Sequence, residues 1–474
     1  MNYSPAVRPL PVELRAEIIG VDQVVPLLDG RQVPYVNLDN AASTPSLRCV
    51  KEKMDEVLDY YSSVHRGSGF KSLLSTQLYE EAREIVMDFV SADREKDVVV
   101  FCKNTTEALN KLANRFPFQS GDIVLTTGME HHSNDLPWRA RAQVIHAGLC
   151  SDGSLDMEDF QANLEKYSGK IKLVAVTGAS NVTGFMPPIF DIAEMAHRHG
   201  AKIVVDCAQL LPHRSIDMQP FDSPHHLDFI AFSAHKVYAP LGSGALIGPR
   251  EFFNQGNPDC VGGGTVEIVT LDEVVWTSAP EREEAGSPNV IGAIGLAASL
   301  KFLSQVGMDA IAAHENELTH YALTKLRAIK GITLFGSTDV NNLEKRVGVI
   351  PFRVDGIPHG MAAAILGFEG GVGVRSGCFC AHPYVLHLLK VDDETYRLYH
   401  ARVLEHNRSE LPGLIRVSFG CYNNYSDVDR LVEMLERIVR RNYVGDYIEE
   451  ACSGSYFPRG FNPHSVREYF SCSG

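Results

Sequence analysis

Short apolar segments rich in Val and Ile alternate with helical patterns between about residues 97 and 250 of this chain. This alternation is typical of βαβ units, in which crossover helices join parallel strands. It therefore predicts an α/β protein with a mostly parallel sheet. The expected strands are Asp97–Cys102, Asp122–Thr126, Ile171–Thr177, Lys202–Asp206 and Leu227–Phe232, and the expected helices are Glu107–Phe116, Asp156–Tyr167 and Ile189–His199.

The pattern changes after residue 289. One long helix is expected from Val290 to about Ile329, followed by strands at Gly348–Arg353 and Leu414–Ser418 and a final helix at Tyr425–Arg441. We expect these elements to form a smaller α+β domain, with the first residues of the chain packed against it. The predicted organisation is a large domain at 35–289, a small domain built from 1–34 and 290–441, and a tail at 442–474 whose composition differs from both.

The composition argues against several classes of protein. Lys and Arg number 44 against 59 Asp and Glu, a formal net charge of −15, so the overall field repels nucleic-acid phosphates. The N-terminus does not have the pattern of a secretory signal, and no apolar run reaches membrane-spanning length. Ten cysteines in a chain of 474 residues do not indicate a disulfide framework. We expect a cytoplasmic protein that binds neither nucleic acid nor membranes.

Two of the predicted strands end in residues with a shared chemical use. One ends in Asp206, and the other leads into Ser233, His235 and Lys236. Ligands of an open parallel sheet bind at the carboxyl ends of its strands, where these side chains would meet. A lysine that forms a Schiff base and a carboxylate that holds a pyridinium nitrogen are the groups that pyridoxal 5′-phosphate requires. Lys236 alone would be read as a solvated lysine, but its pairing with Asp206 favours this cofactor.

Further polar residues suit other parts of the same cofactor. Thr105 and Thr106 open a helix after a strand, where free backbone N–H groups favour a phosphate, and Thr105 is the expected cap. His131 follows another strand, and its flat ring could stack on a cofactor ring and carry protons. His131 and His132 could instead form a solvated turn or bind a metal. We expect no metal, because no Cys or carboxylate stands at a matching spacing.

A series of motifs connects these residues. In chain order they are Leu38-Asp-Asn-Ala-Ala-Ser, Val64-His-Arg-Gly, Thr105-Thr-Glu, Glu130-His-His, Ser180-Asn-Val-Thr-Gly, Asp206-Cys-Ala-Gln, Ser233-Ala-His-Lys, Gly262-Gly-Gly-Thr, Glu284-Ala-Gly-Ser-Pro-Asn, Arg375-Ser-Gly-Cys-Phe-Cys-Ala and Ile415-Arg-Val-Ser. This set resembles the class V aminotransferase superfamily, best its cysteine desulfurase and selenocysteine lyase-like group, over roughly residues 35–440. The resemblance implies a homodimeric, fold-type I pyridoxal-phosphate-dependent transferase with a mostly parallel, seven-stranded sheet in its large domain.

The resemblance also implies a role for each matching residue. Lys236 would carry the Schiff base and move protons, Asp206 would keep the ring nitrogen protonated, and His131 would stack on the ring. The remaining cofactor contacts would come from Gln209 at the ring hydroxyl, from Thr105, Thr106, Ser233 and His235 at the phosphate, and from Ser287 of a second subunit. Asn181 and Arg416 would bind the carboxylate of an amino-acid substrate, with Arg375 nearby as a cation that favours a thiolate.

Cys380 matches the nucleophilic cysteine of the desulfurases, which would attack the sulfur of L-cysteine, keep it as a persulfide and release L-alanine. Two departures from the family pattern bear on this expectation. Cys378-Phe379 replaces the usual His-His, so that Cys378 could share the persulfide, bridge to Cys380 or be structural. An insertion near 384–411 could form a lid, dock a sulfur-acceptor protein or be an inert surface segment.

Other functions remain open at the level of sequence. A C–S lyase, an aminotransferase or an epimerase acting on an amino acid would use the same cofactor without a nucleophilic thiol. A scaffold protein that had lost the reaction is disfavoured by the presence of Lys236, Asp206 and His131.

Overall fold

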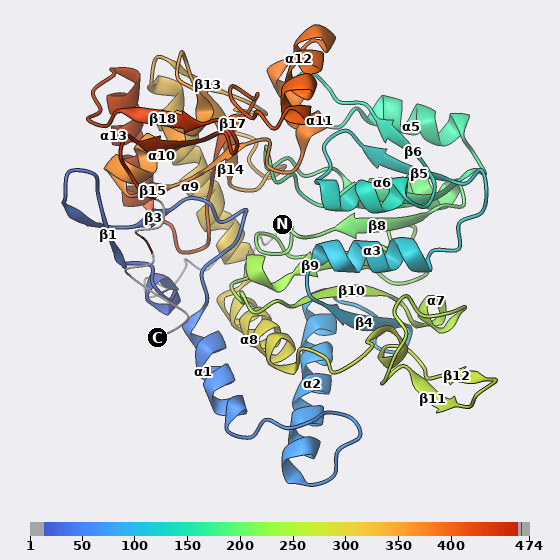
Figure 1. Cartoon of the computed structure of the whole chain (residues 1–474). Helices are drawn as coiled ribbons and strands as arrows, with labels where there is room; N and C mark the ends of the chain where they lie inside the picture. The colour runs from blue at the N-terminus through green and yellow to red at the C-terminus, as the bar shows by residue number, and fades with distance from the viewer. Residues whose placement is uncertain (1–13, 463–465, 467–474) are drawn as a thin grey trace, which may run out of the picture.

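The computed structural model describes residues 14–462 and 466, and its centre is a seven-stranded sheet (Figure 1). The strand order is β4-β10-β9-β8-β7-β5-β6, and only β10 runs antiparallel to its neighbours. The bounds are β4 Asp97–Cys102, β5 Ile123–Thr127, β6 Gln143–Ala147, β7 Ile171–Thr177, β8 Lys202–Asp206, β9 Phe229–Ser233 and β10 Gly244–Pro249. The expected α/β class with a mostly parallel sheet is confirmed, and β6 and β10 are additions to the expected strands.

Helices cover both faces of this sheet, which explains why its strands are nearly continuous apolar runs. Alternate residues of one strand enter different apolar clusters: Val204 packs with α3 (Thr105–Arg115), whereas Ile203 and Val205 pack with α5 (Met157–Lys166) and α6 (Ile189–Arg198). The three helices begin and end within two residues of the expected positions. Because both faces are buried, polar side chains are left to the strand ends.

The part of the chain where the smaller domain was expected contains a second, antiparallel sheet of order β13-β14-β17-β16. Its strands are β13 Ile332–Leu334, β14 Val349–Val354, β16 Arg375–Gly377 and β17 Leu414–Ser418, and its helices include α9 Met308–Ala328, α10 His359–Gly370 and α13 Tyr425–Val439. The N-terminal segment joins it, since β3 (Val36–Asn37) pairs in parallel with β15 (Val372–Gly373) and Leu38 packs in the same apolar cluster. The segment after β3 lies beside β17, since Asp39 forms a parallel bridge with Ser418.

One expected element is wrong. The single long helix from Val290 to about Ile329 is two helices, α8 (Val290–Val306) and α9, separated by Gly307. Gly307 has φ = 95°, which residues with a Cβ rarely adopt, so the apolar pattern continues while the backbone turns.

Among the described residues no single helix is long and apolar enough to cross a membrane. One helix pair, α8 with α9, reaches the required length and apolar character only when its two helices are taken together, and that pair is bent by 76°.

The insertion and the tail both contain regular structure. In the insertion, α11 (His382–Leu389) is anchored by buried Tyr384, Val385 and Leu388, whereas α12 (Asp393–Leu404) has no buried residue. In the tail, a hairpin of β18 (Tyr447–Glu450) and β19 (Ser455–Pro458) packs against α10. The other elements are β1 Val24–Pro26, β2 Gln32–Pro34, α1 Arg48–Leu58, α2 Phe70–Phe89, α4 Leu136–Arg139, α7 Arg250–Asn254, and the hairpin of β11 Val266–Val269 with β12 Val274–Trp276, which projects from the large domain (Figure 1).

Candidate active site

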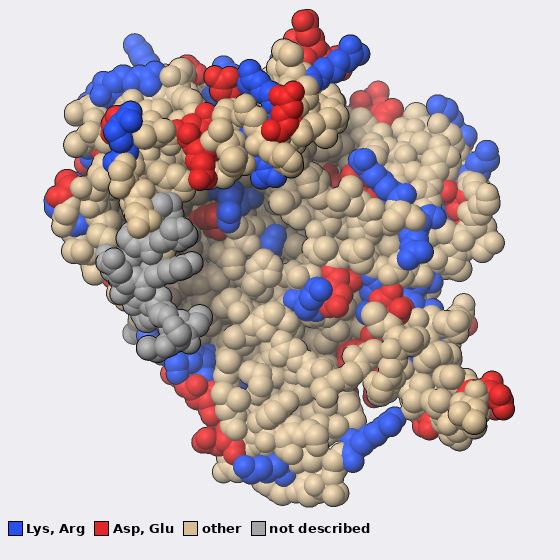
Figure 2. Space-filling view, in the orientation of Figure 1, with Lys and Arg blue, Asp and Glu red and all other residues tan. Residues whose placement is uncertain are grey.

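A pocket of about 340 Å³ lies at the carboxyl ends of the central strands, where they meet the small domain. Figure 2 shows this face of the molecule hollowed between the two domains, with basic and acidic side chains inside the hollow. The pocket wall contains all but one of the expected site residues: Thr105, Thr106, His131, Asn181, Asp206, Gln209, Ser233, His235, Lys236, Arg375, Cys380 and Arg416. The exception is Ser287, which lines a separate pocket of about 370 Å³ beside the β11–β12 hairpin.

One end of the pocket is rich in hydroxyl groups around the start of α3. The Thr105 N–H donates to Ser233 Oγ (2.8 Å), and Thr106 Oγ1 lies 2.7 Å from Ser133 Oγ. The expected helix cap is wrong by one residue: Asn104 accepts from the Glu107 N–H (3.0 Å), and Thr105 is the first helical residue. A helix N-terminus surrounded by hydroxyl donors is suited to a phosphate.

His235 lines the same region as a neutral ring. Burial, and then the charge of Lys236, lower the pKa of His235 to about 4. At neutral pH its imidazole can therefore donate one hydrogen bond and accept another.

Lys236 and Asp206 face the middle of the pocket. Burial lowers the pKa of Lys236 to about 8, while the Asp206 carboxylate opposes this shift. Burial also raises the pKa of Asp206 above its usual value. The Ala208 N–H, which donates to Asp206 Oδ1 (2.9 Å), opposes this rise. A lysine with such a pKa is partly neutral at physiological pH, as a nucleophilic or proton-transferring amine must be.

Gln209 gives a direct indication that this part of the pocket accommodates a ligand. Its Nε2 donates to the Ala41 carbonyl (2.6 Å), whereas its Oε1 is buried without a hydrogen-bond partner. A buried acceptor left unpaired is destabilising, so its presence on a pocket wall is consistent with a ligand hydroxyl that would satisfy it.

His131 is held as a neutral ring of defined tautomer. Burial, and then the charge of Lys236, lower the pKa of His131 to about 3. Its Nδ1 accepts from the Ser133 N–H (3.1 Å), so the ring proton is on Nε2. The neighbouring His132 does not line the pocket; it stacks on His382, the first residue of α11, with ring centroids 4.9 Å apart and an interplanar angle of 4°.

The small domain supplies a pair of arginines to the opposite wall. Arg416 Nη1 donates to the Asn181 carbonyl (2.9 Å), its Nη2 pairs with Asp39 (2.9 Å), and its buried Nε has no partner. Arg375 pairs with the other oxygen of Asp39 (2.8 Å). The side-chain amide of Asn181 is already engaged, because its Nδ2 donates to the Phe379 carbonyl (2.8 Å).

The loop of Cys380 is tied to both domains. Phe379 and Cys380 have φ of 53° and 55°, a left-handed conformation that is unfavourable for residues with a Cβ. It is held by the His132 N–H, which donates to the Cys380 carbonyl (2.8 Å), and by Arg416, whose guanidinium lies 5.0 Å from the centre of the Phe379 ring. The Cys380 side chain is exposed on the pocket wall.

Cys378 is placed differently from Cys380. Its thiol donates to the Pro412 carbonyl (3.2 Å), and burial raises its pKa to about 11. Both cysteines are free. Because the thiolate is the nucleophile, the Cys378 thiol is poorly suited to attack a substrate.

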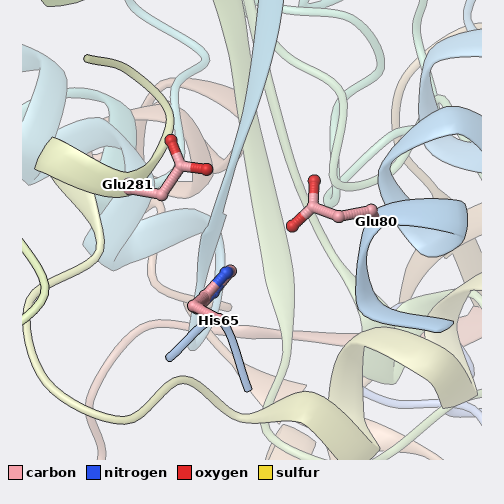
Figure 3. Close-up of side chains that lie close together, drawn as sticks. All are labelled: His65, Glu80 and Glu281. Carbon is pink, nitrogen blue, oxygen red and sulfur yellow. The ribbon is translucent and has the colours of Figure 1, made fainter. Parts of the chain in front are cut away.

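A cluster of His65, Glu80 and Glu281 lies outside this pocket (Figure 3). Their ligand atoms fall within 4.8 Å of one another, and Figure 3 shows the three side chains converging from separate segments. Glu80 also accepts from Arg83 Nε (3.2 Å), so a cation already lies against the group. The chemistry of the strand-end pocket does not use this cluster.

Two features of the site were not anticipated. Asp39 lies in a quoted motif, Leu38-Asp-Asn, but nothing in that motif indicates that it pairs with residues more than three hundred positions away. The stacked pair of His132 and His382 was equally hidden, since each residue reads alone as a surface histidine.

The pKa of Lys236 leads to a testable prediction for the cofactor-free protein. The rate at which acetic anhydride acylates Lys236 is expected to rise about tenfold per pH unit and to level off above pH about 8, since only the neutral amine reacts. Peptide mass spectrometry measures the rate. In an Asp206→Asn variant the midpoint should move to lower pH, because the Asp206 carboxylate raises the pKa. A midpoint unchanged or higher in that variant would contradict the described pairing, and Lys236→Arg controls for the peptide assignment.

The fold and the pocket define an α/β protein with the architecture of fold-type I pyridoxal-phosphate-dependent enzymes. The chain belongs to the aminotransferase class-V family, whose model matches residues 36–431. It is 36% identical over 430 residues to a probable cysteine desulfurase of Halalkalibacterium halodurans, covering 88% of this chain and 97% of that protein. It is 37% identical over 415 residues to a probable cysteine desulfurase of Pyrococcus abyssi, covering 85% and 94%.

Solved structures agree with this assignment. The apo structure of a cysteine desulfurase from Thermococcus onnurineus has a TM-score of 0.78 and 33% identity, with 92% of this chain and 99% of that chain covered. The cysteine desulfurase CsdA from Escherichia coli has a TM-score of 0.74 and 29% identity, with 91% and 98% covered. The expected family is thereby confirmed.

Proposed function

We propose that this protein is a pyridoxal-phosphate-dependent cysteine desulfurase, which converts L-cysteine to L-alanine and keeps the sulfur as a persulfide on Cys380. The observation that carries the proposal is the exposed Cys380 thiol on the wall of a pocket that also contains Lys236 and Arg416. The names of the relatives and structural neighbours support it.

The residues of the pocket fit the cofactor. Its phosphate would be held by Thr105, Thr106, Ser233 and His235, and its ring by Asp206, Gln209 and His131, with the unpaired Gln209 Oε1 as the acceptor for a ring hydroxyl. When bound, pyridoxal phosphate withdraws electrons from the substrate carbon next to the amino group and so weakens the C–S bond.

The chain's own groups would then bind the substrate and move protons. Arg416, with its unpaired Nε, would take the substrate carboxylate, and Asn181 would hold both Arg416 and the Cys380 loop in place. Lys236 would take and return the proton of the substrate carbon, which its lowered pKa favours. The neutral His131 ring would donate a hydrogen bond from Nε2, since its Nδ1 already accepts one from the Ser133 N–H.

The thiolate of Cys380 would attack the substrate sulfur. An S–S bond forms between Cys380 and the substrate sulfur. The C–S bond breaks with its electron pair moving to the side-chain carbon that carried the sulfur, and a proton added to that carbon gives alanine. Arg375 and Arg416 supply positive charge on the same pocket wall as Cys380.

Cys378 takes no part in the proposed sulfur transfer, so its removal is expected to have a small effect on alanine formation. A Cys378→Ala variant is expected to keep alanine formation within about threefold of the unchanged protein, because the half-buried Cys378 thiol donates to the Pro412 carbonyl. Steady-state alanine release and trapping of the persulfide with iodoacetamide, read by mass spectrometry, check this. Loss of the persulfide in this variant would mean that the sulfur passes through Cys378.

The active unit is proposed to be a homodimer. Ser287 lies outside the pocket of its own chain, and large apolar side chains are exposed nearby on the β11–β12 hairpin, including Ile268, Val269 and Leu271. Exposed apolar patches of this kind mark interfaces, and a second copy covering this face could bring its Ser287 to the phosphate. Sedimentation velocity tests the dimer; a monomer that holds the cofactor normally would contradict this part.

For the sulfur acceptor we propose only its class, and for the location only the cellular compartment. Cys380 is exposed, so a persulfide on it would be accessible to an acceptor protein or a small reductant. The nine described cysteines are all free, which is consistent with a reducing, cytoplasmic location.

The deciding experiment is the analysis of products from L-cysteine with the cofactor-loaded protein and a thiol reductant. Equal amounts of alanine and sulfide are expected. Pyruvate and ammonia would instead identify a C–S lyase, which expels the leaving group without an enzyme thiol, and would contradict the role of Cys380.

A further inference from the structure

Two like charges face each other beside the pocket. Arg375 on β16 and Arg416 on β17 are directly opposite partners in an antiparallel pair. Like charges at such positions repel and destabilise a sheet. Arg375 is half exposed, whereas only 2% of Arg416 is accessible, so Arg416 cannot turn into solvent to relieve the repulsion.

A single carboxylate compensates both arginines. Asp39 Oδ2 lies 2.8 Å from Arg375 Nη2, and its Oδ1 lies 2.9 Å from Arg416 Nη2. The Asp39 N–H donates to Asn37 Oδ1 (3.0 Å), and the Asp39 backbone bridges to Ser418 of β17. Asp39 thus belongs to the N-terminal segment, and its backbone is held against β17, the strand that carries Arg416.

The three groups leave one net positive charge at this wall, since two guanidinium cations face one carboxylate. The environment of Arg416 is consistent with this balance: burial lowers its pKa, Asp39 raises it and Arg375 lowers it. The unpaired Nε of Arg416 is the buried donor left for a ligand.

We propose that Asp39 is a specificity-determining residue, which sets the charge of the arginine pair to +1 and so selects amino acids with one carboxylate over those with two. It is a positioning residue, because it acts through Arg375 and Arg416, which line the pocket, and not by touching substrate itself. The inference rests on the proposed function only in taking an amino acid as the ligand. A second carboxylate would find no further net positive charge at the arginine pair, in a pocket that also contains the Asp206 carboxyl group.

Charge-compensating variants test this assignment. Binding of L-alanine and of L-aspartate to the cofactor-loaded protein is measured by calorimetry, which does not depend on turnover. The unchanged protein should prefer L-alanine, and Asp39→Asn, with a wall charge of +2, should shift that preference toward L-aspartate by about tenfold or more. Arg375→Gln, with no net charge, should weaken both ligands.

The double variant Asp39→Asn/Arg375→Gln separates charge from structure. It returns the wall to +1 through Arg416 alone, so the preference for L-alanine should recover to within about threefold of the unchanged protein. Asp39→Glu keeps the charge and should keep the preference. Thermal unfolding and cofactor absorbance verify that each variant is folded.

Two outcomes would overturn the inference. An Asp39→Asn variant with an unchanged ratio of the two affinities, or a double variant that recovers nothing, would make Asp39 a structural residue only. Both differ from a failure of the proposed function, in which the unchanged, loaded protein would form pyruvate and ammonia instead of alanine from L-cysteine, whatever its preference between the two ligands.

Discussion

A Cys380→Ala variant is expected to lose alanine formation from L-cysteine by at least about 10³-fold while still binding the cofactor and the substrate. The proposed reaction needs a thiolate at the substrate sulfur, and Cys380 is the one cysteine among the described residues that line the pocket. The neighbouring Cys378 cannot take over, because its half-buried thiol donates to the Pro412 carbonyl and its pKa is raised to about 11. Alanine is quantified by chromatography, and binding by the change in cofactor absorbance on adding L-cysteine.

The matched control is Cys378→Ala, which removes a thiol two residues away without touching the pocket wall. Cys380→Ser is a second control, since it retains the shape of the side chain but has a far weaker nucleophile. If Cys380→Ala still released alanine at more than a tenth of the normal rate, sulfur would leave the substrate without this thiol, and the desulfurase proposal would fail.

A Lys236→Ala variant is expected to lose turnover by on the order of 10⁴-fold. Lys236 is the one lysine among the described residues of the pocket wall, and its pKa of about 8 makes it the available base. The guanidinium groups of Arg375 and Arg416 stay protonated and cannot accept a proton in its place. The variant should still bind pyridoxal phosphate, because Asp206 and the hydroxyls near α3 remain, but gel filtration should now remove it.

Added methylamine should restore a part of the lost activity, since a small free amine can enter the space of the deleted side chain. Lys236→Arg is the control in which the charge stays and the reactive amine is lost; it should be as inactive as Lys236→Ala. Substantial turnover in either variant would contradict the assignment of Lys236.

Five of the seven strands of the central sheet could be predicted from the sequence. Its strands are runs such as Lys202–Asp206, and helices of the expected length separate them, because a sheet covered on both faces requires continuous apolar strands. The two strands of the central sheet that were not anticipated are β6, an edge strand with mixed polarity, and β10, the one antiparallel strand of that sheet. The break at Gly307 was also missed, because an apolar pattern continues through a backbone turn that one glycine allows.

The sequence by itself determined the chemical groups of the site: Lys236 and Asp206 follow directly from strand ends, where the local pattern and the edge of the sheet coincide. Only the tertiary structure decided which groups act together. It brought Asp39 between Arg375 and Arg416, and it separated exposed Cys380 from half-buried Cys378, whose thiol is bonded to the Pro412 carbonyl. The physical reason is that local patterns reflect hydrogen bonding and burial along one segment, whereas charge pairing and the access of a thiol depend on contacts between segments far apart in the chain.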